Sequence, residues 1–194
     1  METHKNYLLD LDNAEKEIWQ LLLQGTVNKK SSFHCPTLST VGEQGVNLRT
    51  LILRQVIAST KSLIFFTDNR SKKALDIKFN DNVVLHIYDS RHKLQIQLYG
   101  KAVVEKYTKK AKTTWQNLNN FSKKNYMSLL PPGSKIDNLK ELEFNKIDND
   151  GFKNFALIII GIKRIECLHL LRDKNLRAEF IYNKNKIIKN WLMP

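Results

Sequence analysis

Two stretches of the sequence decide the fold class: Arg49-Thr-Leu-Ile-Leu-Arg54 and Leu94-Gln-Ile-Gln-Leu-Tyr-Gly100. In the second stretch apolar residues alternate with polar ones, as in a strand that has one buried and one exposed face. The first stretch lies in a longer alternating pattern from Val46 to Ile57. A period of two residues predicts β-strands, and the contrast between their two faces favours antiparallel pairing.

The same reading extends to the rest of the chain. It predicts further strands over 36–41, 62–67, 83–88, 93–105, 155–162, 164–170, 180–182 and 186–191. Helical spacing predicts a helix over about 12–24, capped by Asp12 or Asn13 and stopped at Gly25. Two more helices are predicted over 70–79, where Asp68 could be the cap, and over 107–126. This order predicts a small antiparallel barrel with helices packed outside.

No repeat or linker divides the sequence, so we expect one domain over 1–194. Its parts are the N-terminal helix at about 12–24, a barrel core at about 35–105, a helical segment at about 107–126 and C-terminal strands at about 155–192. No apolar run is long enough to span a bilayer, and the N-terminus lacks a secretory pattern. We therefore expect a cytoplasmic protein that does not bind membranes.

The charge of the chain favours anionic ligands. The net charge is +13, and 25 of the 32 basic residues are lysine. Nucleic acid is an unlikely partner, because base-edge readout and bidentate phosphate binding favour arginine. The two cysteines have no CxxC spacing, and among the histidines only His86 and His92 lie close together, at a turn, so we predict no metal site.

None of the standard catalytic signatures occurs, but cations and hydroxyls cluster. Arg49 and Arg54 are five positions apart, which places them on opposite faces of a strand unless a bulge intervenes. The segment from Thr67 to Lys73 carries two hydroxyls, an arginine and two lysines where a strand ends and a helix begins. Free backbone N–H groups and the helix dipole make such a junction a phosphate site. The alternative is a solvated basic helix start.

Three motifs in order resemble the pyridoxamine 5′-phosphate oxidase family. They are Arg49-Thr-Leu-Ile-Leu-Arg54, Phe65-Phe-Thr-Asp-Asn-Arg-Ser-Lys-Lys73 and Leu94-Gln-Ile-Gln-Leu-Tyr-Gly100. The resemblance is best over residues 35–105 and points to the FMN-binding branch of the family rather than to the authentic oxidase. It implies a mainly β (α+β) protein, an antiparallel Greek-key split β-barrel with flanking helices. It also implies a homodimer with flavin mononucleotide (FMN) at the interface, in a site made by both subunits.

The resemblance also implies roles for individual residues. The residues expected to bind the FMN phosphate are Arg49, Ser71, Lys72 and Lys73. Arg54 would approach N1 or O2 of the flavin ring, where positive charge favours the reduced anion. The ring would be lined by the backbone of Thr50, Leu51, Ile52 and Leu53. The ribityl chain and the ring region would contact Phe66 and Thr67, and Gln95 would hydrogen-bond the cofactor. The alternatives are a core position for Phe66 and a solvated edge position for Gln95.

The sequence departs from the family at its C-terminal motif. The oxidase has roughly Arg-Leu-His-Asp-Arg before an aromatic residue, whereas this chain has Asn175-Leu-Arg-Ala-Glu-Phe180. A tryptophan expected near Leu168 is also missing. We therefore expect a flavin-dependent oxidoreductase that acts on an unknown small molecule. The alternatives are a non-enzymatic flavin-binding or stress protein, the authentic oxidase, and a barrel that has exchanged flavin for haem or nucleic acid.

Overall fold

The computed structural model describes residues 10–139, 150–184 and 186–194. Its helices are α1 (Leu11–Val27), α2 (Lys72–Phe79), α3 (Lys109–Asn117) and α4 (Asn120–Lys124). Its strands are β1 (Thr37–Gly42), β2 (Gly45–Thr50), β3 (Leu53–Ile57), β4 (Ser62–Asp68), β5 (Asn82–Asp89), β6 (Leu94–Glu105), β7 (Phe155–His169), β8 (Leu176–Tyr182) and β9 (Ile187–Leu192). All the strand pairs are antiparallel.

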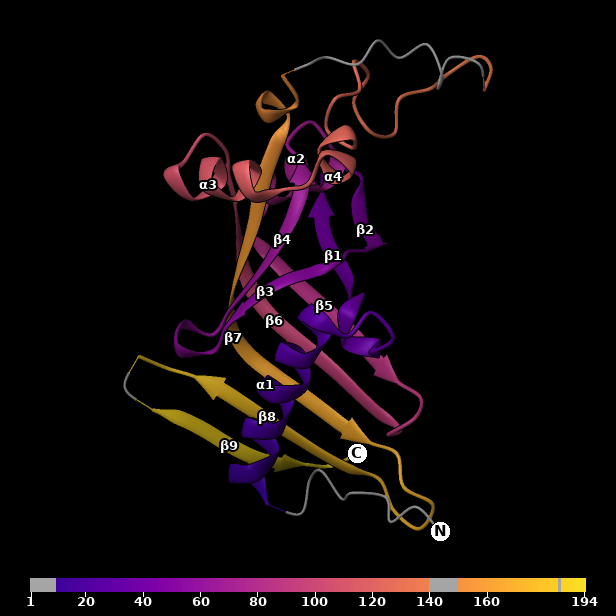
Figure 1. Ribbon diagram of the computed structural model, residues 1–194. Coiled ribbons are helices and arrows are strands. Elements are labelled where there is room, and N and C mark those ends of the chain that lie inside the picture. Colours follow the sequence, from indigo (N-terminus) through magenta and orange to yellow (C-terminus); the bar gives the residue numbers. More distant parts are fainter. Residues whose placement is uncertain (1–9, 140–149, 185) are drawn as a thin grey trace.

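The nine strands form one sheet that splits along β7. The main path is β2-β1-β5-β6-β7-β4-β3, and the β8–β9 hairpin joins it at β7. The first half of β7 pairs with β4 and the second half pairs with β8, while β6 runs along its other edge (Figure 1). This branching is the split of the barrel, and it confirms the predicted antiparallel split-barrel fold.

The predicted long strand from Val46 to Ile57 is wrong, because it is two strands. β2 ends at Thr50 and β3 begins at Leu53, and the two strands lie at opposite ends of the sheet path. Only Leu51 and Ile52 link them, and the N–H of Leu51 donates to the carbonyl of Pro36 at 3.0 Å. A two-residue link cannot cross a flat sheet of this width, so the sheet curls until its two ends meet.

Two further segments differ from the sequence prediction. The helix predicted over 107–126 is two helices, α3 and α4, interrupted at Leu118 and Asn119. The side chain of Asn119 accepts a hydrogen bond from the N–H of Ser122 and so begins a new helix. The strands predicted over 155–162 and 164–170 are the single strand β7.

The ends of α1 also differ. Asp10 caps the helix, accepting the N–H of Asp12 at 2.9 Å, so the predicted caps at Asp12 and Asn13 are wrong. The helix passes through Gly25 instead of stopping there. A Cβ at Gly25 would lie 2.6 Å from the carbonyl oxygen of Phe33, so glycine is needed there for close packing rather than for helix termination.

Two clusters of buried side chains hold these elements together. The larger one packs α1 against the sheet through residues such as Ile18, Leu22 and Phe33. The smaller one lies where α3 and Tyr126, which follows α4, cover β4 and β7 at Phe155. In Figure 1, α2, α3 and α4 lie together at one end of the molecule, and α1 lies toward the other end, near β8. No helix within the described ranges is long and apolar enough to cross a membrane.

Candidate functional site

The turn between β4 and α2 brings two hydroxyls and an ammonium group together. The Oγ1 atom of Thr67 lies 3.2 Å from the Oγ atom of Ser71, and the Nζ atom of Lys73 donates to Thr67 Oγ1 at 3.3 Å. Thr67 and Ser71 are buried, with 3% and 2% of their surface exposed. Lys72 lies on the exposed side of the same turn of helix. The predicted cluster therefore exists, and its hydrogen-bonding groups are held within a few ångströms of one another.

The first turn of α2 has no capping side chain. Ser71 occupies the N-cap position, but its hydroxyl donates to the carbonyl of Asp68 at 2.7 Å. The prediction that Asp68 caps this helix is wrong, because its carboxylate binds the backbone and guanidinium of Arg70. The N–H groups of Lys72 and Lys73 are thus left to an external acceptor, which is the usual donor set for an anion at a helix N-terminus.

Arg49 reaches this region from β2. Its guanidinium donates to Thr40 Oγ1 at 2.6 Å and lies 3.3 Å from the carboxylate of Asp76 on α2. The same Asp76 oxygen also accepts the hydroxyl of Thr40 at 2.6 Å and the amide of Asn47 at 3.1 Å. Sequence reasoning missed Asp76 and Thr40. Asp76 lies three residues after Lys73 and thus on its side of the helix, but nothing in the sequence marks Thr40.

The electrostatics of this region favour a bound anion. Burial lowers the pKa of Lys73, and the nearby charge of Arg49 lowers it further, while Asp68 opposes both effects. Burial also lowers the pKa of Arg49, and Asp76 opposes that shift. Two half-buried cations that repel each other are stabilised most by a ligand that carries more than one negative charge.

Arg54 and Phe66 lie next to each other at the start of β3. The pairing of β3 with β4 shifts register between Leu53 and Gln55, so Arg54 occupies the irregular position that the sequence analysis allowed for. Its guanidinium lies over the ring of Phe66, 5.2 Å from the centroid. Phe66 is half-buried and packs edge-on against Phe155 at 5.4 Å, so it is both a core residue and a surface residue of the site.

The link between β2 and β3 contributes backbone to the same area. Thr50 and Ile52 are exposed, Leu51 is half-buried, and Leu53 is fully buried against the core. Tyr126, which the sequence reasoning also missed, lies near Arg54. Burial raises the pKa of Tyr126 to about 12, and the charge of Arg54 opposes the shift. Its phenol is therefore neutral at physiological pH.

Gln95 does not join this group within one chain. It pairs with Leu168 near the end of β7, whereas Thr67 pairs with Ala156 near the beginning. These two positions on β7 are separated by about 40 Å of extended chain, at roughly 3.3 Å per residue. Of the predicted residues, the structure brings together Arg49, Thr67, Ser71 and Lys73, with Arg54 and Phe66 at the neighbouring β3–β4 pair.

The family resemblance is borne out by comparison with known proteins. Residues 16–106 match the family model described as pyridoxamine 5′-phosphate oxidase, FMN-binding domain. The chain is a split barrel of the pyridoxamine 5′-phosphate oxidase type. The match begins within α1, covers the barrel core and ends before α3. A comparison with the curated proteins gives no significant match.

Solved structures show the same split-barrel fold. A pyridoxamine 5′-phosphate oxidase-related, FMN-binding protein from Nostoc punctiforme is 19% identical, with a TM-score of 0.75 over 92% of this chain and 97% of that one. PhzG from Burkholderia lata, solved with tetrahydrophenazine-1-carboxylic acid, is 14% identical, with a TM-score of 0.75 over 93% and 92% of the two chains. At these identities the likeness establishes the fold.

This split barrel differs from the oxidase motif where β7 pairs with β8. The buried carboxylate of Glu166 accepts a hydrogen bond from Nε of Arg177 at 3.0 Å and a second, closer one from the same guanidinium. Arg164 donates to Glu166 at 3.3 Å and stacks over the ring of Tyr99, 3.9 Å from its centroid. Glu179 lies 3.7 Å from Arg164. Arg164 and Arg177 are thus already paired with carboxylates, whereas Arg172 is exposed in the link between β7 and β8.

Proposed function

We propose that this protein binds FMN and is a flavin-dependent oxidoreductase that acts on a small molecule. The observation that carries the proposal is the convergence of Arg49, Thr67, Ser71 and Lys73 on the uncapped first turn of α2. A bound flavin would supply the electron chemistry, so the protein needs no catalytic triad. The match of residues 16–106 to an FMN-binding domain supports the choice of FMN over other phosphorylated ligands.

The donor set at the turn fits a phosphate monoester. The ammonium of Lys73 and the uncapped N–H groups of α2 lie beside the hydroxyls of Thr67 and Ser71. The guanidinium of Arg49, held by Asp76, is close enough to lower the pKa of Lys73. Beside it, the exposed backbone of residues 50–52 and the Arg54–Phe66 pair offer a surface for a flat ring system. The charge of Arg54 would stabilise a negative charge that develops on the flavin when it is reduced.

We also propose that the working form is a homodimer in which each FMN site uses both chains. The distance of Gln95 from the β4–α2 turn within one chain supports this proposal, because one small ligand cannot contact both. Gln95 lies beside Leu168, and the neighbouring Gln97 pairs with Glu166. A partner that supplied Gln95 would therefore bring the charged pairs of Glu166 close to the cofactor, where they would contact the substrate.

The absorbance spectrum of the purified protein tests the proposal. We expect the visible maxima of oxidised flavin after purification or after FMN is added, with FMN bound more tightly than riboflavin. Consumption of NAD(P)H or uptake of oxygen with a panel of substrates then separates an enzyme from a protein that only holds flavin. A protein that stays colourless at saturating FMN would contradict the proposal.

A further inference from the structure

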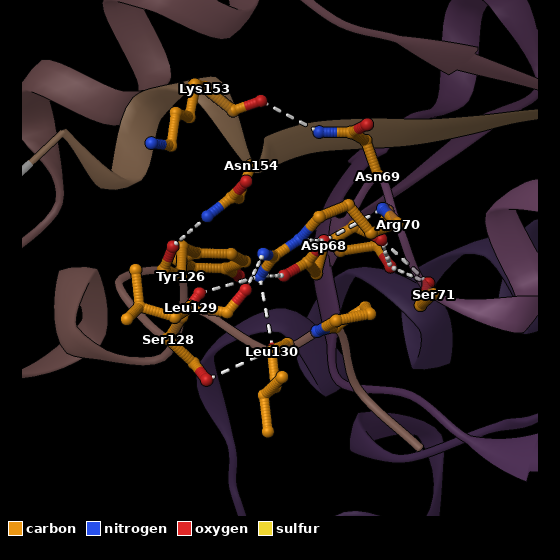
Figure 2. A network of polar contacts seen from close by, with 12 residues as sticks. Asp68, Asn69, Arg70, Ser71, Tyr126, Ser128, Leu129, Leu130, Lys153 and Asn154 are labelled. Atoms are coloured by element: carbon orange, nitrogen blue, oxygen red, sulfur yellow. Dashed lines mark hydrogen bonds and ion pairs between the residues drawn. The ribbon is translucent and has the colours of Figure 1, made fainter. Parts of the chain in front are cut away.

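Arg70 lies in the middle of the proposed phosphate turn, yet its side chain points away from the anion position. Its Nε atom donates to Asp68 at 3.1 Å, and one terminal nitrogen donates to the other oxygen of Asp68 at 2.7 Å. The remaining bonds cross to a segment about 60 residues later in the chain, as Figure 2 shows. The guanidinium is therefore occupied with protein groups and is not a phosphate ligand.

In this later segment, the acceptors of Arg70 are three consecutive backbone carbonyls. Arg70 donates to Ser128 at 3.0 Å, to Leu129 at 2.9 Å and to Leu130 at 3.5 Å. These residues follow α4 and belong to no helix or strand, so their carbonyls depend on such a donor. A planar guanidinium can donate to several acceptors at once through N–H groups in fixed directions. A lysine ammonium carries the same charge but cannot reproduce this arrangement of donors.

A second set of hydrogen bonds begins at Asn69 of the same turn and reaches the beginning of this segment. The backbone N–H of Asn69 donates to the carbonyl of Asn154 at 2.8 Å, and the side chain of Asn69 donates to the carbonyl of Lys153 at 2.9 Å. Asn154 in turn donates to the carbonyl of Tyr126 at 2.8 Å. The turn at residues 68–71 is thus linked to the end of segment 126–130 directly through Arg70, and to its beginning through Asn154 (Figure 2).

The position of segment 126–130 affects the surface around the proposed flavin site. The ring of Tyr126 packs edge-on against Phe155 at 5.0 Å, and Phe155 packs against Phe66, over which Arg54 lies. A cavity of about 190 Å³ is lined by Asp68, Ser128 and Leu130, among others. The family model matches residues 16–106, so this segment lies outside the matched residues.

We infer that Arg70 is a positioning residue that couples phosphate binding at the turn to the placement of segment 126–130, and so shapes the wall of the substrate site. This inference rests on the proposed FMN function. A phosphate that binds Thr67, Ser71 and Lys73 restrains the same four-residue turn from which Arg70 extends. Because linkage is reciprocal, a restraint on the turn restrains the segment, and the segment in turn stabilises the phosphate-binding form.

Hydrogen–deuterium exchange of the full chain tests this inference, with Arg70→Lys and Arg70→Ala compared with the unchanged protein. Without flavin, we expect the amides of Tyr126 and Met127, which donate to the carbonyls of Lys123 and Lys124, to exchange at least about tenfold faster in both variants, since local opening sets their protection. With saturating FMN, the unchanged protein should gain protection at 126–130, and riboflavin should give less. Neither variant should show that gain, even when its flavin absorbance proves that FMN is bound. Arg91→Lys, an exposed arginine in the β5–β6 turn, is the matched control.

The results for the flavin-free proteins and for the FMN-bound proteins test different claims. Equal exchange at 126–130 in all flavin-free proteins would overturn the positioning role of Arg70. An equal gain of protection on FMN binding in the unchanged protein and in Arg70→Lys would overturn the coupling. An unchanged protein that binds no FMN would overturn the proposed function and the coupling with it, while the flavin-free comparison would still decide whether Arg70 holds the segment.

Discussion

The ammonium of Lys73 donates to the hydroxyl of Thr67 at 3.3 Å, and the charge of Arg49 is close enough to lower the pKa of Lys73. Their positions come from different elements, since Lys73 extends from α2 and Arg49 from β2, where Asp76 holds its guanidinium. A phosphate at the N-terminus of α2 would relieve their mutual repulsion and accept the uncapped N–H groups. Single-residue changes that alter this balance of charge should therefore alter the affinity for FMN.

Loss of Lys73 or Ser71 should weaken FMN much more than riboflavin. Each charge-assisted hydrogen bond lost from Lys73→Ala or Ser71→Ala costs about 1.5–3 kcal/mol, which is roughly ten- to a hundredfold in affinity. Titration of flavin fluorescence measures both dissociation constants. Lys78→Ala, which removes an exposed lysine from the same helix, should leave both unchanged. An equal loss for FMN and riboflavin would mean that the cluster does not contact phosphate.

The affinity for FMN should fall at alkaline pH earlier than an ordinary lysine would predict. The pKa of Lys73 in the flavin-free protein is lowered by burial and by Arg49, whereas a bound phosphate would raise it. The charged form binds phosphate, so affinity is full below the lowered pKa and declines as pH rises toward the raised one. Dissociation constants measured from pH 7 upward test this. Lys73→Arg should remove the decline, because arginine stays charged.

Pyridoxamine 5′-phosphate should be a poor substrate or none. A second phosphate needs its own cationic site. Of the candidates Arg177 and Arg172, the first is already bound to Glu166, with Glu179 nearby, and the second is exposed in the link between β7 and β8. A carboxylate there repels a dianion, and an occupied arginine would first have to break its pair. Steady-state oxidation with oxygen as acceptor, on protein whose flavin content is known, decides the point. Turnover of about 1 s⁻¹ or faster, the low end for ordinary enzymes, would identify an authentic oxidase.

At the scale of elements, one polar group ties α1 to both halves of the barrel. Glu15 on α1 accepts a hydrogen bond from Lys61, before β4, at 2.8 Å and another from the hydroxyl of Tyr182 on β8 at 2.9 Å. Trp19 donates its indole N–H to the same hydroxyl at 2.8 Å. The amphipathic pattern of α1 predicts a buried face, but it does not predict which strands that face contacts, because those partners are far away in the sequence.

Removal of the Tyr182 hydroxyl should destabilise the fold measurably. In Tyr182→Phe the indole N–H of Trp19 and one acceptor position of Glu15 lose their partner inside a partly buried network, which costs about 1–3 kcal/mol. Urea unfolding followed by tryptophan fluorescence gives the free energy of unfolding. Tyr88→Phe, at a tyrosine that is 49% exposed, is the control and should unfold like the unchanged protein. Identical unfolding midpoints for the two variants would show that the hydrogen bonds of the Tyr182 hydroxyl do not contribute to stability.

At the scale of the whole molecule, the arrangement of β7 decides where the proposed cofactor residues lie. One end of this strand pairs with β4, which leads into the phosphate turn, and the other end lies beside Gln95 and the Glu166 pairs. In the proposed dimer, a single chain would therefore supply two partial sites, one at each end of β7. A two-fold dimer would unite each with the complementary half of the partner.

Mixing of two defective variants tests this shared site. Light scattering at micromolar concentration should give the mass of a dimer. Lys73→Ala and Gln95→Ala homodimers should each bind FMN weakly. Co-expressed, they should regain tight binding in about a quarter of the sites, because random pairing makes half of the dimers mixed and each mixed dimer has one intact site. No regained binding, or a monomer with flavin bound, would contradict the shared site.

The sequence by itself determined the features that depend on neighbouring residues. Alternation along the chain predicted which side chains of β6 face the core, and the run from Thr67 to Lys73 predicted a strand end, a helix start and a cluster of hydroxyls and cations between them. The tertiary structure alone decided the break at Leu51–Ile52, the contact of Arg49 with Asp76, and the pairing of Arg177 with Glu166. The physical reason is that periodicity encodes local conformation and faces, whereas barrel closure and strand pairing bring together groups that no local pattern relates.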